Sequence, residues 1–511
     1  MTETAPVAAP LAAAPPAPKS GLIGWIERRP QAAFGAFLAL HFAVWTALPS
    51  LLYANLPLDL IEALTYGREW QLGYDKLPPL PWWIVEILHR GVGADAAYYA
   101  IAQAAVLIAF AFVFAAARPL LGATGALLAV LIIDGTHYFQ YTAVKFNHDV
   151  VQLPFWAMAG YAFHAALKRG RLVHWGLLGL ALGGALWAKY FVVVLAAPYA
   201  LFMLFDNKAR RALATPGPWL AVVIALVVAS PHVLWLLRTD FLPLAYVEHR
   251  ATAVRGWWDH LVHPALFLGS QMFFLLPTLA IAAAYAWPRA KAGPPRQAAD
   301  GFDRRIVTLI AFGPALAMIV LIALSGRGAV AMWGYPLWLY LGLWIVMAVG
   351  APLDAARLRR VVAAWAAVFA ILVIAFVVNY TVLPLFDHRY RAAFFPGDKL
   401  GAILTERFHA ATGAPLHYVI GSMWDGGNLA HYSPDQPQVL IDGKPARAPW
   451  IDLGDLRRKG AVVVWTQSDP NVLPAQLAAL VPGAEPGAPF DLPMRRGTGS
   501  VHVGWAILKP Q

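Results

Sequence analysis

The chain has 511 residues, of which 59% are hydrophobic and 13% charged, and its formal net charge is +11. This composition excludes a soluble globule and is typical of a protein whose solvent is mostly lipid. The sequence contains no cysteine, which excludes disulfides, cysteine-ligated zinc and a thiol nucleophile.

The first predicted elements are a leader and a membrane anchor. Residues 1–30 are rich in Ala and Pro and lack the basic n-region and cleavage site of a signal peptide, so we predict a disordered cytoplasmic leader. The apolar run at 33–53 follows. It is long enough to cross a hydrocarbon core of roughly 30 Å, which takes about 20 helical residues. We expect this first span to be retained as an anchor.

Further apolar runs predict a polytopic α-helical membrane protein with about eleven transmembrane helices in all. They lie at 96–117, 120–137, 150–167, 173–188, 190–205, 218–237, 265–287, 305–325, 329–350 and 361–384. Basic clusters fall in alternate loops, as in membrane proteins that keep positive charge inside. With an odd number of spans, this pattern places the N-terminus in the cytoplasm and the C-terminus outside. The net positive charge is then a topology signal, and no nucleic-acid partner is expected.

Residues 387–511 lack long apolar runs and are predicted to form a small α/β domain outside the membrane. Strand-like pieces lie at 415–421, 438–442, 461–467 and 501–508, and helix-like pieces at 397–413 and 474–481. Residues 31–386 are then the transmembrane domain, in which 54–95 form the first outer loop and carry the candidate chemistry.

The first outer loop gathers charges in a chain that has few of them. Its stretch "LPLDLIEALTYGREWQLGYDKLPPLPWW" covers residues 56–83. Asp59 and Glu62 are three residues apart, so they share one face if this piece is a short interfacial helix. A carboxylate pair beside Lys76 suits a reaction that deprotonates a hydroxyl and stabilises an anionic leaving group. We therefore assign Asp59 and Glu62 to catalysis.

Other residues of this loop receive different roles. Lys76 precedes a Pro pair that starts the short amphipathic segment "LPWWIVEIL", which is expected to lie along the interface. Lys76 would then sit at headgroup level, where it can bind a donor phosphate, and the nearby Tyr74 is assigned to substrate binding. Glu69 and Asp75 are interpreted as charges that only solvate the loop and anchor it to headgroups.

A second polar cluster lies in "YTAVKFNHDVVQLPFW", which places Lys145, Asn147, His148 and Asp149 at the mouth of a span. Such a group is costly unless it faces protein or a water-filled cavity. Helix capping explains one of these residues but not all of them, so Asp149 is a catalytic candidate, and Asn147 and His148 are substrate-binding candidates. Lys189 either marks a short outer turn or lines the cavity, and in the second case it binds the donor phosphate.

Two further outer segments supply weaker candidates. Arg327 lies at an outer turn, where a guanidinium could clamp a phosphate. In "YVEHRATAVRGWWDH", Glu248, His249 and Arg250 could line an acceptor groove, and His249 is assigned to substrate binding. The histidines show no metal-ligand spacing, so no metal site is predicted, although a divalent cation stays an open alternative as cofactor. The absence of a Walker-type glycine loop disfavours an ATP-driven pump.

Taken in order, these motifs resemble one family. The "LD..E" pattern precedes "GYDKLPPLPWW", "FNHDVVQLPFW", "GLALGGALWAKY" and "MWGYPLW". This series is similar to the membrane glycosyltransferases of family 39, relatives of the dolichyl-phosphate-mannose protein mannosyltransferases and of the lipid A aminoarabinose transferase, with the GT-C fold. The resemblance covers residues 30–340. No single motif is specific, but the ordered set is.

The resemblance implies transfer of a sugar from a polyprenyl-phosphate donor on the outer face of the bacterial inner membrane, usually with inversion. Carried over by position, Asp59 is the base or acceptor-orienting carboxylate with Glu62 assisting, Asp149 is the second acidic site, and Lys76 binds the phosphate. In two places the sequence departs from the family pattern. Leu77 stands where many relatives have His, and the family's acidic pair is often adjacent, which leaves the base open between Asp59 and Glu62.

The leading hypothesis is therefore a glycosyltransferase that modifies lipid A, lipopolysaccharide or another envelope glycan. Its expected partners are the lipid-linked donor, a lipid or glycan acceptor and membrane lipids. Three alternatives remain: a protein O-glycosyltransferase, a transporter or flippase of lipid-linked sugar, and a scaffold that presents the C-terminal domain. Transport is disfavoured because the polar clusters lie at outer-loop junctions and not near the bilayer midplane, where transporters bind their substrates.

Overall fold

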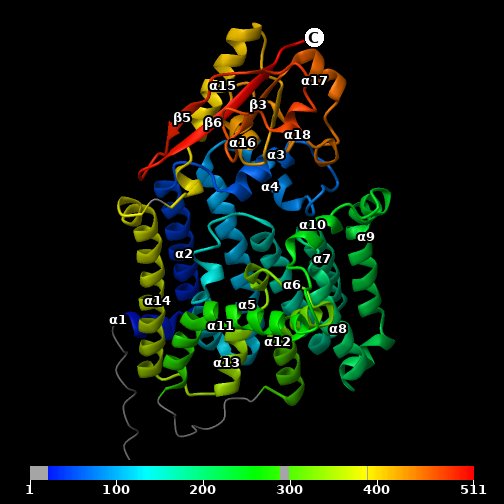
Figure 1. Cartoon of the computed structure of the whole chain (residues 1–511). Helices are drawn as coiled ribbons and strands as arrows, with labels where there is room; N and C mark the ends of the chain where they lie inside the picture. The colour runs from blue at the N-terminus through cyan, green and yellow to red at the C-terminus, as the bar shows by residue number, and fades with distance from the viewer. Residues whose placement is uncertain (1–20, 288–298, 388) are drawn as a thin grey trace, which may run out of the picture.

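Figure 1 shows the computed structural model, which describes residues 21–287, 299–387 and 389–511. A bundle of long helices carries, at one end, a domain built around a β-sheet. The bundle contains α1 (Gly21–Arg28), α2 (Pro30–Leu52), α3 (Leu58–Gly67), α4 (Leu80–Gly91), α5 (Asp95–Asp134), α6 (His148–Arg169), α7 (Leu172–Ala188), α8 (Val192–Phe205), α9 (Pro216–Arg238), α10 (Leu244–Arg250), α11 (Asp259–Ala286), α12 (Gly301–Ser325), α13 (Leu341–Val349) and α14 (Ala355–Thr381).

The membrane class is confirmed by the helices themselves. Within the described residues, 7 helices are long and apolar enough to cross a membrane, and α7 and α8 are shorter apolar helices. Helix α5 contains a kink at Gly122, whose φ is 70°, three residues after Pro119. The runs predicted as separate spans at 96–117 and 120–137 correspond to the two helices that meet at this kink, where the backbone of Gly122 is not helical. The predicted count of eleven spans is not confirmed.

Two predicted segments differ from the structure. The apolar run at 329–350 is not one long helix, because α13 covers only Leu341–Val349. Before it, Pro336 cannot donate a helical hydrogen bond, and Gly334 packs so closely on Gln271 that a Cβ atom would lie 1.8 Å from its Oε1. In the expected leader, residues 21–28 form helix α1, and residues 1–20 lie outside the described part of the chain.

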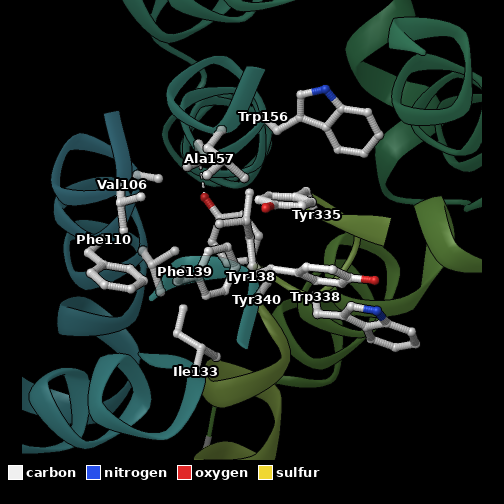
Figure 2. Packing of buried hydrophobic residues seen from close by; sticks show 14 of the residues in the cluster. Val106, Phe110, Ile133, Tyr138, Phe139, Trp156, Ala157, Tyr335, Trp338 and Tyr340 are labelled. Atoms are coloured by element: carbon white, nitrogen blue, oxygen red, sulfur yellow. Dashed lines mark hydrogen bonds between the residues drawn. The ribbon is translucent and has the colours of Figure 1, made fainter. Parts of the chain in front are cut away.

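A buried aromatic core joins α5, α6 and the segment before α13 (Figure 2). The rings of Tyr138 and Tyr335 stack with their centroids 4.5 Å apart, and the Tyr340 hydroxyl donates to the carbonyl of Ala157 in α6. Gly160 allows this contact, because a Cβ atom there would lie 2.2 Å from the Tyr340 ring. The core fixes the connection from α5 to α6, which leads directly to the second polar cluster.

The C-terminal domain is a small α/β domain, as predicted. Its helices are α15 (Gly397–Thr412), α16 (Asp425–Tyr432), α17 (Leu453–Lys459) and α18 (Ala475–Ala478), and its strands are β1 (Tyr418–Gly421), β2 (Gln438–Ile441), β3 (Ala461–Trp465), β4 (Glu485–Pro486), β5 (Phe490–Pro493) and β6 (Ser500–Leu508). The strand-like and helix-like pieces expected from the sequence correspond to β1, β2, β3, β6, α15 and α18. The sequence patterns missed α16, α17, β4 and β5, which are short.

The sheet combines parallel and antiparallel pairs in the order β2-β1-β3-β6-β4, with β5 also paired to β6. Strand β1 runs parallel to β2 and β3, in the register that pairs Val419 with Val439 and Val462, and β6 is antiparallel to β3. Side chains on the two sheet faces alternate between two cores. Val462 and Val464 pack with α15 on one face, and Val463 packs with Leu456 of α17 and Leu477 of α18 on the other.

Candidate active site

Two short helices at the end of the bundle position the charges of the first outer loop. Helix α3 begins at Leu58 after Pro57, and α4 begins at Leu80 after Pro79, as the proline positions predict. Asp59 lies in the first turn of α3, where the positive end of the helix dipole favours a carboxylate. Asp59 and Glu62 share one face of α3, as their spacing predicts, and both line the same cavity.

This charged cavity has a volume of about 510 Å³ and is formed by segments that are far apart in the sequence. Helix α3, the loop before α4 and the start of α6 supply polar groups, and the segments 190–194, 244–250 and 321–333 add mainly apolar and aromatic side chains. Its lining includes Asp59, Glu62, Lys76, Leu77, Trp82, Asn147, His148, Asp149, Lys189, Phe191, Val193, Val194, Leu244, Tyr246, Arg250, Leu321 and Trp333. One cavity thus combines charges with an apolar wall.

The first ion pair of the charged cavity joins Lys76 to Glu62. The Lys76 ammonium donates to Glu62 Oε2 and also lies 5.1 Å from the centre of the Tyr246 ring, in the range of a cation–π interaction. Burial raises the pKa of Glu62, and the charge of Lys76 opposes this shift. Burial would lower the pKa of Lys76, but the Glu62 carboxylate outweighs it and the pKa is raised. Lys76 therefore stays charged.

A second ion pair, between Lys189 and Asp149, lies deeper in the protein. The two residues are 5% and 6% exposed, and the Lys189 ammonium donates to Asp149 Oδ1, which also accepts from Gln152 Nε2 at 3.1 Å. Lys189 is the residue that ends helix α7. The structure therefore favours the cavity over the outer turn for Lys189, and pairing makes the burial of both charges tolerable.

The remaining members of the second polar cluster hold the site together. Asn147 caps helix α6 by accepting from the amides of Asp149 and Val150, and its Nδ2 donates to Asp59 Oδ2 at 2.9 Å. Asn147 is thus both a helix cap and a site residue. The ring of His148 lies 2.9 Å from the carbonyl of Pro78, which fixes the loop that carries Lys76. Lys145 is exposed and does not line the cavity.

Two predicted site residues, Tyr74 and Arg327, are not brought into the charged cavity. The hydroxyl of Tyr74 donates to the carbonyl of Tyr66 at 2.7 Å, and Tyr74 is buried, so it supports the loop and does not reach a substrate there. Arg327 donates to the carbonyl of Glu248 at 3.1 Å and is not part of the lining. His249 belongs to α10, but its side chain lies outside the described part of the structure.

Glu69 and Asp75 also differ from their predicted role. Instead of anchoring a loop to headgroups, they bind the C-terminal domain. Asp75 accepts from Arg447 Nε at 2.8 Å, and Glu69 accepts from Gln438 Nε2 at 2.9 Å. Nothing in the local sequence predicts these contacts, because Asp75 and Arg447 are 372 residues apart in the chain and Glu69 and Gln438 are 369 residues apart.

The sequence analysis gave no role to Tyr246 and Trp333, which line the cavity, and it considered Arg250, which also lines it, only as part of an acceptor groove. The only sequence signal for Tyr246 is that it opens the polar, Trp-rich stretch 246–260. Among the residues that the structure describes, no group of three or more His, Asp or Glu side chains is arranged to hold a metal ion.

The clamp between Arg447 and Asp75 leads to a prediction. Arg447→Gln removes the guanidinium that bridges Asp75, Asp442 and the Tyr66 hydroxyl, and the loss of these half-buried contacts should cost about 1–2 kcal/mol. We expect a lower unfolding midpoint of the full chain in detergent. Arg458→Gln removes an exposed ion pair of the same domain and should leave the midpoint unchanged. Equal midpoints for the two variants would contradict the clamp.

Comparison with known protein families gives a match over part of the chain. The family model described as dolichyl-phosphate-mannose-protein mannosyltransferase matches residues 76–235, which include Lys76, Asn147, Asp149 and Lys189. Two curated relatives come from Rhizobium johnstonii. A lipid A galacturonosyltransferase, RgtD, is 27% identical over 40% of this chain and 44% of its own length. A lipopolysaccharide core galacturonosyltransferase, RgtA, is 26% identical over 40% of this chain and 41% of its own length. The chain thus matches less than half the length of these relatives.

Comparison with solved structures extends the likeness to nearly the whole chain. ArnT from Cupriavidus metallidurans bound to undecaprenyl phosphate superposes with a TM-score of 0.62 at 14% identity, covering 96% of this chain and 98% of that one. Its apo form gives a TM-score of 0.61. At this identity the likeness concerns the fold, and the sequence match over residues 76–235 concerns the family. The chain therefore has an ArnT-like fold, and its segment 76–235 is similar in sequence to the dolichyl-phosphate-mannose-protein mannosyltransferase family.

Proposed function

We propose that the chain transfers a sugar from a polyprenyl-phosphate donor to lipid A, to the lipopolysaccharide core or to another envelope glycan. The observation that carries this proposal is the charged cavity, in which the half-buried Asp59 and Lys76 and the buried Lys189 meet an apolar wall. A lipid-linked sugar phosphate needs these three features: an apolar surface for the prenyl chain, cations for the phosphate and a carboxylate for the acceptor hydroxyl. The relatives that act on lipid A and lipopolysaccharide core support the acceptor class.

We assign the donor phosphate to Lys76 and Lys189, with Arg250 at the rim. Each ammonium carries three N–H donors, of which the carboxylate partner uses one, so the others can bind phosphate oxygens. As the bond between the anomeric carbon and the phosphate oxygen breaks, the leaving oxygen takes the electron pair and its negative charge grows. A donor placed for this charge stabilises the transition state by about 3 kcal/mol.

We assign the base to Asp59 and not to Glu62. Asn147 engages only Oδ2 of Asp59, and within the described residues Oδ1 has no hydrogen-bond partner, so it can take the proton of the acceptor hydroxyl as the new glycosidic bond forms. Glu62 is 6% exposed and holds Lys76. Its role is to position that ammonium, because a carboxylate committed to an ion pair is a poorer proton acceptor.

We further propose that this site faces the periplasm. The charged cavity and the C-terminal domain lie at the same end of the bundle, and the alternating basic loops favour a cytoplasmic N-terminus. On this assignment residues 31–386 form the catalytic membrane domain and residues 387–511 a periplasmic domain of a bacterial inner-membrane protein.

The test is mass spectrometry of lipid A and lipopolysaccharide from cells that lack this protein, complemented with wild type or with Asp59→Asn. We expect one sugar mass to disappear and to return only with wild type. An unchanged lipid and polysaccharide profile, with the sugar found on protein, would replace this proposal by protein O-glycosylation. If purified protein in detergent shows no transfer while vesicles still accumulate lipid-linked sugar, the chain is a transporter.

A further inference from the structure

A second cavity, the junction cavity, lies between the membrane domain and the C-terminal domain. It has a volume of about 450 Å³, within the range of small-molecule sites. Its lining comes from both domains: Leu64 and Thr65 of α3, Arg68 directly after α3, Glu86, His89 and Arg90 of α4, and Gly427, Ala430, His431, Gln436 and Val439 of the C-terminal domain. Figure 1 shows α16 resting on α3 and α4.

The junction cavity is separated from the charged cavity by helix α3. Leu58, Asp59, Glu62 and Ala63 line the charged cavity, and residues 64, 65 and 68 line the junction cavity, so the two sites use different sides of one short helix. Helix α3 is closely packed against α16 here, because a Cβ atom on Gly427 of α16 would lie 2.6 Å from the Ile61 side chain of α3. A ligand in one cavity therefore does not occupy the other.

The polar groups of the junction cavity combine donors and acceptors. Glu86 is 3% exposed and accepts from Arg90 Nε at 2.6 Å. Nδ1 of His89 is hydrogen-bonded to the Tyr98 hydroxyl, 3.0 Å away, so Nε2 is the ring nitrogen that remains for a ligand. Burial lowers the pKa of His431 to about 4, so its neutral ring offers one donor and one acceptor. Mixed donors and acceptors suit hydroxyl groups, since each hydroxyl both donates and accepts.

The backbone at the rim of the junction cavity is strained. Gln436 has a φ of 46°, a conformation that residues other than glycine adopt at a cost, and its exposed side chain lines the cavity. Arg68 Nη1 donates to the carbonyl of Pro437, the next residue, at 2.9 Å. Strain of this kind is often found where a side chain must point at a ligand.

We propose that the junction cavity binds a sugar residue of the acceptor glycan, so that the two domains hold the acceptor between them. This inference rests on the proposed function, because it takes the acceptor to be a glycan. The cavity suits the acceptor better than the donor. Only Leu64, Ala430 and Val439 give it aliphatic side chains of some size, too few for a prenyl chain, and α3 places it beside the catalytic face.

The test measures binding of the core oligosaccharide released from lipopolysaccharide by deacylation. Titration calorimetry uses the full chain in detergent, in the Asp59→Asn background, where no turnover is expected. Gln436→Gly removes the side chain from the cavity without adding strain, because glycine adopts a φ of 46° freely. Glu86→Gln keeps the shape of the side chain but replaces one carboxylate oxygen, a hydrogen-bond acceptor, by an amide donor. We expect the Kd to rise about three- to tenfold in each variant. Gln476→Ala, on the exposed side of α18, should leave it unchanged.

Three results would overturn the inference. They are the absence of saturable binding to the parent protein, an unchanged Kd in both cavity variants, and displacement of the oligosaccharide by undecaprenyl phosphate, which would place it in the charged cavity. Failure of the proposed function is a separate outcome, because it appears as an unchanged lipid A and lipopolysaccharide profile in cells that lack the protein. In assays with turnover, Gln436→Gly should raise the KM for acceptor and leave kcat nearly unchanged.

Discussion

Asp59→Asn is expected to reduce the rate of sugar transfer by a factor of about 100 to 10,000, the usual contribution of a positioned general base. The amide has the shape of the carboxylate and can still accept from Asn147, which donates to Asp59 Oδ2 at 2.9 Å. The geometry of α3 should therefore be kept while the proton acceptor is lost. The measurement is the initial rate of transfer by purified protein in detergent, with a polyprenyl-phosphate sugar as donor.

A matched control separates this effect from a general effect of charge. Asp95 begins α5 on the same side of the bundle and is exposed, and it does not line the charged cavity. Asp95→Asn should transfer sugar at the wild-type rate. If Asp59→Asn retains more than a tenth of the wild-type rate while Glu62→Gln does not, the base is Glu62 and the two carboxylates exchange the roles proposed here.

Lys76→Met is expected to have the second largest effect. Methionine has nearly the length of the lysine stem but no charge, so the variant removes a cation and leaves the packing of the loop mostly intact. We expect kcat/KM for the donor to fall by a factor of about 100 to 1,000, which corresponds to the loss of about 3–4 kcal/mol of transition-state stabilisation. Initial rates over a series of donor concentrations would separate the loss in kcat from the rise in KM.

The charge balance of the site offers a sharper test of Lys76. Lys76→Met leaves the buried Glu62 without its ammonium, and an unpaired buried carboxylate destabilises a protein. The double variant Lys76→Met with Glu62→Gln should recover the unfolding midpoint but not the activity. Lys145→Met, which removes an exposed lysine beside the same cavity entrance, is the control for total charge. Recovery of activity in the double variant would assign Lys76 a structural role only.

The local patterns of the sequence predicted the elements that carry the site. The three-residue spacing of Asp59 and Glu62 placed both on one face of α3, and the Pro78–Pro79 pair correctly marked the start of α4. The polar residues Lys145, Asn147, His148 and Asp149 were recognised as a costly group at the mouth of a helix, and the last three of them line the cavity. These inferences succeeded because helix periodicity and capping depend on neighbours only a few residues apart.

Predictions that depended on distant contacts were less successful. Tyr74 and Arg327 have side chains suited to a substrate, but Tyr74 donates to Tyr66 and Arg327 to the carbonyl of Glu248. The run at 329–350 has the hydropathy of a membrane helix, yet the packing of Gly334 on Gln271 and the aromatic core around Tyr340 hold its first half in turns. Hydropathy records how apolar a segment is, but not which neighbours it meets.

The sequence by itself determined that this is a polytopic helical membrane protein with a C-terminal α/β domain and a charged loop after the first span, because hydropathy and periodicity are read from residues that are close together in the chain. Only the tertiary structure decided which charges pair. Lys189 pairs with Asp149, 40 residues away in the chain, and Asn147 binds Asp59, 88 residues away. Arg447 binds Asp75 across a separation of 372 residues. The physical reason is that a buried charge is stable only beside its partner, and the packing of the helices brings those partners together.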